Sequence, residues 1–380
     1  MNILKLKNVL NNIDPKLTGV FLPWALRHPR YIQTFIRLVR SHEQTKKLRE
    51  DEKSKGILVP PFLIISITSR CNLFCAGCYA AAAGTVHHKK GSKEQQLNRE
   101  QWKAIISEAS ELGVFGFVIA GGEPFLYPGL LELCKEFKDR FFLIVTNGTA
   151  LKETDFEILK HSSNIAVIVS VEGTREITNA RRGQCVYEKA TSTLERICKI
   201  GVLTGISAAI TRHNYKYWMD DGQLDRFISQ GIRVGVFIEY IPATNGVNSS
   251  SNDHSLMLTK EERSMFRSQM FNYRAAKPIY IIHSPGDEEF FGGCVSAGRG
   301  FAHVTPEGDL TACPVSNIAT HNLRKSTLRE GLDSSLFKEI RENEHLLETE
   351  GMPCALFAHP KEMDELAKAV GAYRTDIKER

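Results

Sequence analysis

Six apolar runs of strand length recur along the chain, with stretches of helical character between them. The runs are apolar throughout and do not alternate with polar residues, which is typical of strands buried on both faces of a parallel sheet. Capping-box patterns at Asn98 and Thr259 indicate where two of the helices start. This succession predicts an α/β fold, a partial (β/α)6 TIM-like barrel, with its chemistry at the carboxyl ends of the strands. The six runs are residues 62–68, 114–120, 141–145, 165–171, 205–210 and 234–241.

The pattern changes after the sixth run. Residues 242–257 are rich in serine and asparagine and predict a loop. Farther on come a glycine-rich segment with cysteines and a charged helical tail. We therefore predict three parts: an N-terminal helical segment over 1–58, the barrel over 59–280, and a small C-terminal domain over 281–380.

Composition limits the compartment and the class of protein. A chain of 380 residues with 42% hydrophobic and 24% charged residues is typical of a soluble globular protein. It contains no apolar run of about 18 residues, so we expect no membrane span. The N-terminus lacks the pattern of a signal peptide, so we expect a cytoplasmic protein with reduced thiols. Nine cysteines in that compartment indicate metal binding or catalysis, with some left as core residues.

The positive charge is concentrated at one end. Residues 1–40 hold seven basic side chains against one acid, Asp14, while the whole chain carries only +5. With no base-stacking module beside it, this local excess gives little support for nucleic-acid binding. A predicted helix in this segment either packs on the barrel or lies at a membrane surface as a peripheral contact. Its apolar face would consist of Tyr31, Ile32, Phe35, Ile36 and Val39.

Three cysteines follow the first predicted strand within eight residues, in the stretch CNLFCAGC. They are Cys71, Cys75 and Cys78. A structural zinc site needs four ligands, and His87 and His88 are the nearest further candidates. A 4Fe–4S cluster held by three cysteines instead leaves one iron open to another ligand. The spacing favours the cluster over zinc and over unliganded core cysteines.

The Cys-x3-Cys-x2-Cys motif after a first barrel strand resembles the signature of the radical S-adenosylmethionine (radical SAM) enzymes. The resemblance implies that S-adenosylmethionine occupies the open iron and is cleaved reductively to a 5′-deoxyadenosyl radical. It also implies an electron donor such as flavodoxin or ferredoxin. One departure is Gly77, where many members have an aromatic residue.

The resemblance extends to segments that follow the next strands. Gly-Gly-Glu-Pro after the second run resembles the family's contact for the methionyl ammonium, although alone it could be an ordinary turn. Ser170 and Glu172 resemble a family Ser-x-Asp-Gly motif, and Arg182 is assigned to the methionyl carboxylate, a surface arginine being the alternative. The implied cofactor-binding residues are Gly121, Gly122, Glu123, Pro124, Asn147, Ser170, Glu172, Arg182 and Ile241.

The C-terminal part resembles the opening of auxiliary-cluster domains called SPASM or Twitch. Its features are a hairpin turn at Pro306-Glu307-Gly308 and the pair Cys313-Pro314. The resemblance implies a shortened domain with a second iron–sulfur cluster on Cys294, Cys313 and Cys354. The alternative is a hairpin that keeps its shape without metal.

Cys185 stands where family members commonly have glycine. If it faces the cavity, its thiol could return a hydrogen atom to a substrate radical, which would make it a catalytic residue. The alternative is a small residue that fills a gap.

The resulting expectation is a radical SAM enzyme that abstracts hydrogen from a C–H bond of an unidentified small-molecule, lipid or peptide substrate. Auxiliary clusters favour a peptide, whereas the basic N-terminal helix favours a lipid. A non-catalytic iron–sulfur electron-transfer or cluster-binding protein is the alternative from another class. Gly-Gly-Glu-Pro argues against it, because electron transfer needs no ammonium site.

Overall fold

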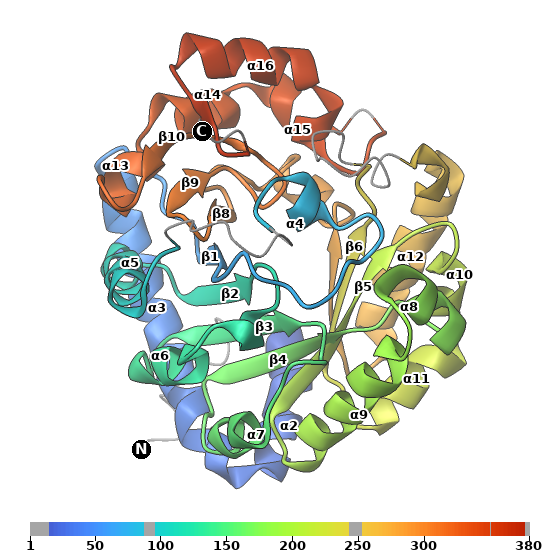
Figure 1. Ribbon diagram of the computed structural model, residues 1–380. Coiled ribbons are helices and arrows are strands. Elements are labelled where there is room, and N and C mark those ends of the chain that lie inside the picture. Colours follow the sequence, from blue (N-terminus) through green and yellow to red (C-terminus); the bar gives the residue numbers. More distant parts are fainter. Residues whose placement is uncertain (1–14, 87–95, 243–252, 350, 377–380) are drawn as a thin grey trace.

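The computed structural model describes residues 15–86, 96–242, 253–349 and 351–376. Within these ranges, eleven strands form one sheet in the order β11-β10-β9-β8-β1-β2-β3-β4-β5-β6-β7. Strands β1 to β7 run parallel, each beside the next in sequence, and curve into a partial barrel (Figure 1). Their bounds are β1 Phe62–Ser66, β2 Gly116–Ala120, β3 Phe141–Thr146, β4 Ile165–Ser170, β5 Leu203–Ile210, β6 Val234–Glu239 and β7 Tyr280–Ser284.

The prediction of a partial α/β barrel is confirmed, and all six predicted strands are present. The structure adds β7 as a seventh parallel strand, across the residues where the sequence suggested a boundary. Burial alternates along β7, with Ile281 buried and Ile282 exposed. The strand therefore lacks the uniformly apolar character by which the other six were found.

Helices follow the strands and cover the outer face of the sheet (Figure 1). Two of them, α5 and α12, begin at the predicted capping boxes of Asn98 and Thr259. In chain order they are α4 Tyr79–Ala82, α5 Arg99–Leu112, α6 Leu130–Glu136, α7 Glu153–Lys160, α8 Arg175–Arg182, α9 Val186–Lys199, α10 Tyr215–Met219, α11 Asp221–Ser229 and α12 Lys260–Ala276.

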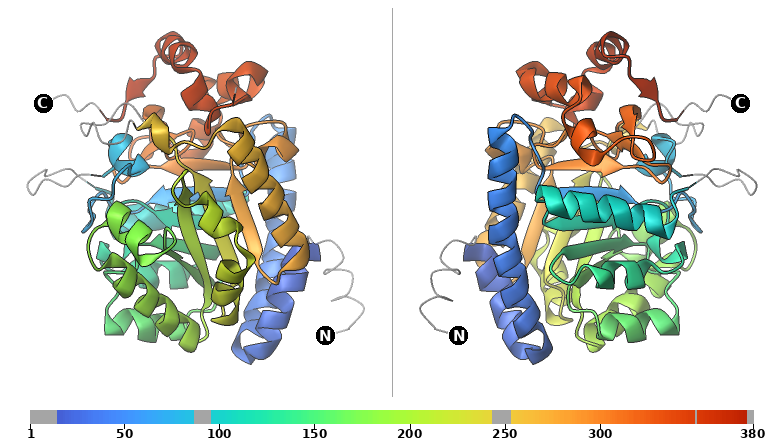
Figure 2. Two further views of the ribbon diagram at one scale, coloured as in Figure 1. Left: turned by 90° about the vertical axis from the view of Figure 1, so that its right-hand side faces the viewer. Right: turned by 90° about the vertical axis from the view of Figure 1, so that its left-hand side faces the viewer.

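Two N-terminal helices, α2 (Pro15–Arg27) and α3 (Ile32–Ser54), precede the barrel. Phe21 of α2 packs on an apolar cluster of inner-face residues from β3, β4 and β6, so this helix covers the inner face away from the cysteine loop. Trp24 and Tyr31 are buried with Leu203 of β5. Helix α3 runs along the side of the molecule beside α5 (Figure 2).

The apolar face predicted for the N-terminal segment is therefore used largely within the fold. Tyr31 and Val39 are buried, Phe35 and Ile36 are half-buried, and Ile32 is exposed. None of the helices in the described part of the chain combines the length and apolar character needed to cross a bilayer.

The C-terminal elements extend the sheet beyond β1. Strand β8 pairs parallel with β1, whereas β9, β10 and β11 are antiparallel. Because β7 and β11 are the two edges, the barrel is not closed. The remaining bounds are β8 Phe301–Val304, β9 Asp309–Thr311, β10 Ile318–Asn322, α13 Leu328–Leu332, α14 Ser335–Glu342, α15 Ala355–Ala358, α16 Pro360–Ala369 and β11 Tyr373–Arg374.

Candidate active site

The three cysteines of CNLFCAGC lie in the loop between β1 and α4, and all three are half-buried. Backbone hydrogen bonds join this loop to two neighbouring segments. The N–H groups of Gly122 and Glu123 donate to the carbonyls of Thr68 and Arg70, each at 2.8 Å. The N–H of Ala76 donates to the carbonyl of Arg181, also at 2.8 Å. The end of β2 and the end of α8 thus hold the loop in place.

The glycines of Gly-Gly-Glu-Pro allow the close approach of β2 to the cysteine loop. A Cβ on Gly122 would lie 2.0 Å from the carbonyl oxygen of Arg70 and 3.0 Å from the nitrogen of Cys71. A Cβ on Gly121 would lie 2.6 Å from the carbonyl oxygen of Thr68, and its φ is +127°. Only glycine fits at these two positions without a shift of the cysteine loop.

Glu123 is fully buried and connects the ends of β2 and β3. Its Oε1 accepts hydrogen bonds from Thr146 Oγ1 at 2.6 Å and from the N–H of Phe125 at 3.1 Å. Its Oε2 accepts from the N–H of Asn147 at 2.8 Å. Burial raises the pKa of Glu123, and these hydrogen bonds oppose the rise. Both oxygens of the carboxylate therefore accept hydrogen bonds from groups of the protein itself.

Asn147 extends this connection to the cysteine loop. Its Nδ2 donates to Asn72 Oδ1 at 2.9 Å, and Asn72 Nδ2 donates to Thr149 Oγ1 at 2.8 Å. Asn72 directly follows Cys71, so the loop after β3 also fixes the first cysteine.

A buried ion-pair cluster adjoins the second cysteine. Oε1 of Glu172 lies 2.5 Å from Nη1 of Arg181 and 2.6 Å from Nη2 of Arg182. Burial acts to raise the pKa of Glu172, but the two guanidinium groups outweigh it and the pKa is lowered. Both arginines also interact electrostatically with Cys75.

Burial opposes ionisation of the first two cysteine thiols of the loop. Burial raises the pKa of Cys71 to about 12. Burial also raises the pKa of Cys75, although Arg182 and Arg181 oppose the rise. Because metal binding requires thiolates, loading of the loop must release protons, and the two arginines favour the resulting negative charge.

The space next to Gly77 is filled by the ring of Tyr240, which directly follows β6. A Cβ on Gly77 would lie 2.6 Å from Tyr240 Cε2, and the φ of Gly77 is +64°. Tyr240 is itself buried. Where many members have an aromatic residue before the third cysteine, this chain instead packs the ring of Tyr240, just after β6, against that position.

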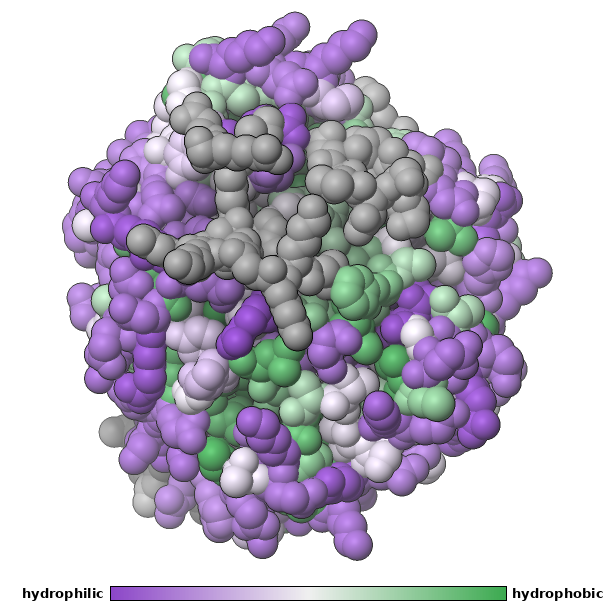
Figure 3. All heavy atoms as spheres, viewed as in Figure 1, coloured by the Kyte–Doolittle hydropathy of each residue, from purple (hydrophilic) through white to green (hydrophobic). Residues whose placement is uncertain are grey.

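The inner face carries small polar side chains at the ends of β1 and β4 and in the middle of β5. Ile65, Val169 and Ile206 pack toward the helices. Because side chains alternate along a strand, the residues that follow them, Ser66, Ser170 and Ser207, point inward. Ser170 Oγ lies 3.0 Å from Ser207 Oγ on this face. Ile241, just after β6, is half-buried against the core. Hydrophobic residues gather at the centre of the face viewed in Figure 1, bordered by hydrophilic ones (Figure 3).

Cys185 is exposed and precedes α9 in the left-handed conformation, with φ +60° and ψ +14°. The left-handed backbone is a physical reason for glycine at this place in relatives. The expectation that Cys185 faces the cavity stays a prediction, whereas the alternative that it fills a gap differs from this exposed position. Sequence could not reveal it, because burial depends on how α8 and α9 meet.

The second group of cysteines is brought together in the C-terminal part. Cys294, Cys313 and Cys354 come from three separate segments, and all are buried. Burial raises the pKa of Cys294 and Cys313 to about 12 and also raises that of Cys354. The predicted hairpin is present as β8 and β9, with Gly308 at φ +98° in the turn.

Glu288 lies beside this second group, and sequence reasoning missed it. It interacts electrostatically with all three cysteines and hydrogen-bonds with Cys294. Ser284 Oγ donates to its Oε1 at 3.2 Å. Burial raises the pKa of Glu288 to about 7. In the sequence, only its position six residues before Cys294 pointed to a place near this cysteine.

A single zinc ion is the alternative ligand that the sequence offers for the cysteine loop. His87 and His88, the other zinc candidates, lie outside the described residues.

Comparisons with known proteins agree with this site. Residues 65–223 match the model of the Radical SAM superfamily. The mycofactocin maturase MftC of Mycobacterium tuberculosis is 27% identical over 319 residues, which cover 77% of this chain and 75% of MftC. The AdoMet-dependent heme synthase of Methanosarcina barkeri is 24% identical over 310 residues, which cover 76% of this chain and 86% of the synthase.

Among solved structures, Streptococcus suis SuiB bound to its precursor peptide SuiA superimposes with a TM-score of 0.63 at 20% identity. The match covers 82% of this chain and 74% of SuiB, and it supports the fold. With its cysteine loop, parallel barrel and family match, the chain contains a radical SAM domain over residues 65–223 and is an enzyme that uses a 4Fe–4S cluster and S-adenosylmethionine.

Proposed function

We propose that this enzyme modifies a peptide at an unreactive C–H bond, with Cys71, Cys75 and Cys78 as the ligands of its 4Fe–4S cluster. The observation that carries the proposal is the cysteine loop, which three neighbouring segments hold at the carboxyl end of β1. When bound, the cluster and S-adenosylmethionine supply a 5′-deoxyadenosyl radical that abstracts hydrogen. The barrel residues bind and orient the reactants and exclude water.

The residues around the loop divide into binding and positioning roles. The backbone of Gly121, Gly122 and Pro124 faces the methionyl ammonium in this proposal. Glu123 and Asn147 act as positioning residues, because their polar atoms are already bonded to the loops they connect.

Arg182 binds the methionyl carboxylate in this proposal, since a guanidinium suits bidentate contact with a carboxylate. Glu172 holds its Nε at 2.7 Å and thereby orients the guanidinium. Ser170 on the inner face and the backbone of Ile241 complete the site toward ribose and adenine.

Two observations support a peptide as the substrate. The relatives include a maturase and a protein solved with its precursor peptide. The barrel is open between its edges, and inner-face residues of β6 and β7 leave apolar side chains exposed there: Ile238 is 41% and Ile282 37% exposed. Exposed apolar side chains along an open edge suit an extended chain, which can place one residue inside and leave the rest outside.

We also propose an auxiliary iron–sulfur cluster on Cys294, Cys313 and Cys354, with Glu288 as the fourth ligand. Three buried cysteines and one carboxylate form a complete set of four donors. Iron analysis after reconstitution tests the cluster: about eight irons per chain would support it, and about four would contradict it. Replacing Glu288 by glutamine should change the electron paramagnetic resonance spectrum of the reduced auxiliary cluster while the iron content stays near that of the unaltered enzyme.

The enzymatic proposal is tested by the release of 5′-deoxyadenosine from reduced protein under anaerobic conditions, with flavodoxin or ferredoxin as the electron donor. The variant Cys78→Ala should release none. Cys198→Ala, a half-buried cysteine near the end of α9, is the matched control and should behave as the unaltered enzyme. Equal release by both variants would contradict the assignment of the loop.

A lipid substrate is the alternative, reached through peripheral contact of the N-terminal helices with a membrane surface. The fold uses much of the apolar face of these helices, which leaves Leu26, Ile32 and Leu48 as exposed apolar side chains. Comparing peptides and lipids of wild-type and deletion strains by mass spectrometry distinguishes the two. An altered lipid with unchanged peptides would overturn the peptide proposal.

A further inference from the structure

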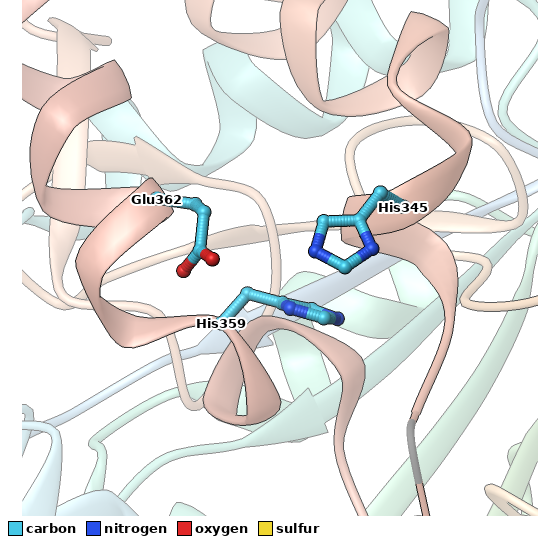
Figure 4. Close-up of side chains that lie close together, drawn as sticks. All are labelled: His345, His359 and Glu362. Atoms are coloured by element: carbon cyan, nitrogen blue, oxygen red, sulfur yellow. The ribbon is translucent and has the colours of Figure 1, made fainter.

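Three potential metal ligands meet outside both groups of cysteines. One ligand atom each from His345, His359 and Glu362 lies within 4.8 Å of the other two. Figure 4 shows the three side chains directed toward one another. The two imidazole ring centroids are 4.1 Å apart, with the ring planes inclined at 54°.

Local structure brings these side chains together. His345 lies in the 3-10 helix Glu344–Leu347. His359 is the N-cap of α16, and Glu362 lies in the first turn of that helix. Residues three apart at a helix start are neighbours on one side of the helix, so His359 and Glu362 are paired by sequence. The packing of α15 on the 3-10 helix then adds His345.

His359 is held in the orientation expected of a metal ligand. Its side chain is only 2% exposed, and Nε2 lies 3.0 Å from the carbonyl oxygen of Glu348. Because a carbonyl can only accept, Nε2 carries the proton and Nδ1 keeps its lone pair. Metal-ligating histidines commonly donate their other ring N–H to a carboxylate, backbone carbonyl or water in this way.

We propose that His345, His359 and Glu362 bind a divalent transition-metal ion, with Zn²⁺ as the best match. Two histidines and one glutamate are an established zinc ligand set that leaves one position for water. Imidazole ligands favour zinc over magnesium or calcium. Residues 342–362 contain five glutamates and one basic residue, Lys361, so the local charge also favours a cation.

The ion would fix the segment that carries Cys354. This cysteine is the N-cap of α15 and lies in the chain between His345 and His359. The carbonyl of Leu347, two residues after His345 in the same 3-10 helix, accepts a hydrogen bond from the N–H of Cys294 at 2.9 Å. An ion that joins His345 to His359 closes the loop between them and reduces its conformational freedom. The site therefore stabilises the arrangement of two of the three C-terminal cysteines.

The test uses the full chain after anaerobic reconstitution, so that iron occupies the cysteine sites. The protein is treated with a chelator, exposed to zinc chloride, desalted and analysed for zinc by mass spectrometry. We expect about one zinc per chain, with X-ray absorption showing only nitrogen and oxygen ligands at about 2.0–2.1 Å. Sulfur scattering at about 2.3 Å, or no retained zinc, would overturn the proposal.

Two exposed ligands can be changed without disturbing the core. His345→Gln and Glu362→Gln should each weaken zinc binding at least about tenfold. His161→Gln, an exposed histidine after α7, is the matched control and should bind zinc as the unaltered chain does. Circular dichroism and iron content verify that each variant is folded. Equal zinc affinity in all three variants would refute the site, whatever the outcome of the 5′-deoxyadenosine assay.

Discussion

The ring of Tyr240 lies against Gly77, so that a Cβ on Gly77 would come within 2.6 Å of Tyr240 Cε2. Gly77 precedes the third cysteine of the loop, and Tyr240 directly follows the sixth strand. The contact therefore couples the cysteine loop to the far side of the barrel opening.

This contact predicts that Gly77→Ala destabilises the protein in two ways. The positive φ costs about 1–2 kcal/mol for any L side chain, and overpacking against Tyr240 adds about 1–3 kcal/mol. Urea unfolding measures the sum. Gly371→Ala has nearly the same φ, +67°, with nothing within 4 Å of its Cβ, so it reports the backbone cost alone. Equal losses in the two variants would show that the Tyr240 contact carries no cost.

Gly122→Ala should prevent assembly of the first cluster while the chain still folds. Its Cβ would meet the carbonyl oxygen of Arg70 at 2.0 Å, and because this is backbone, the cysteine loop must move. We expect the iron content to fall by about four per chain, with no 5′-deoxyadenosine formed. Gly19→Ala, where the Cβ meets nothing within 4 Å, is the control. Full iron content in Gly122→Ala would contradict the role assigned to this glycine.

Glu172→Gln should lower the free energy of unfolding by about 3–5 kcal/mol, because it leaves the Arg181 and Arg182 charges without their buried partner. Glu188→Gln breaks only the exposed pair with Arg175 and should change little. Unfolding curves in urea compare the two.

The stabilising effect of the Glu172 ion pairs should depend on pH. The pKa of Glu172 is lower in the folded than in the unfolded protein, so its contribution is complete above the unfolded value of about 4.3. It is lost as the pH falls through the folded pKa. The stability difference between the unaltered protein and Glu172→Gln should therefore narrow in acid. A difference independent of pH would mean that the ion pairs do not stabilise the fold.

Cys185→Gly should stabilise the protein by about 0.5–1 kcal/mol, because glycine adopts the left-handed conformation without steric cost. Cys185→Ala keeps the Cβ and should leave stability near that of the unaltered protein. If the thiol donates hydrogen to a substrate radical, both variants should release 5′-deoxyadenosine but divert the product. Normal product from both, at the normal rate, would remove the donor role.

Part of the fold and the site could be predicted from sequence because their signals are local. Six strands are apolar on both faces, and each is recognisable from its own residues. The seventh strand, β7, was missed because only one of its faces is buried, with Ile281 buried and Ile282 exposed. Its residues therefore do not form the uniformly apolar run by which the other six strands were found. The first cysteine triad is likewise compact, since all three members lie in one loop.

The sequence by itself determined the reaction class, because the three-cysteine motif needs no distant partner to be read. It also determined the barrel, because the runs of buried residues require a parallel sheet covered by helices. Only the tertiary structure decided which carboxylates and rings surround the cysteines. Tyr240 meets Gly77, and Glu288 meets Cys313 and Cys354, through contacts between segments far apart in the chain. His345 meets His359 across a shorter loop. Such contacts depend on how strands and helices pack, and no local pattern of residues encodes them.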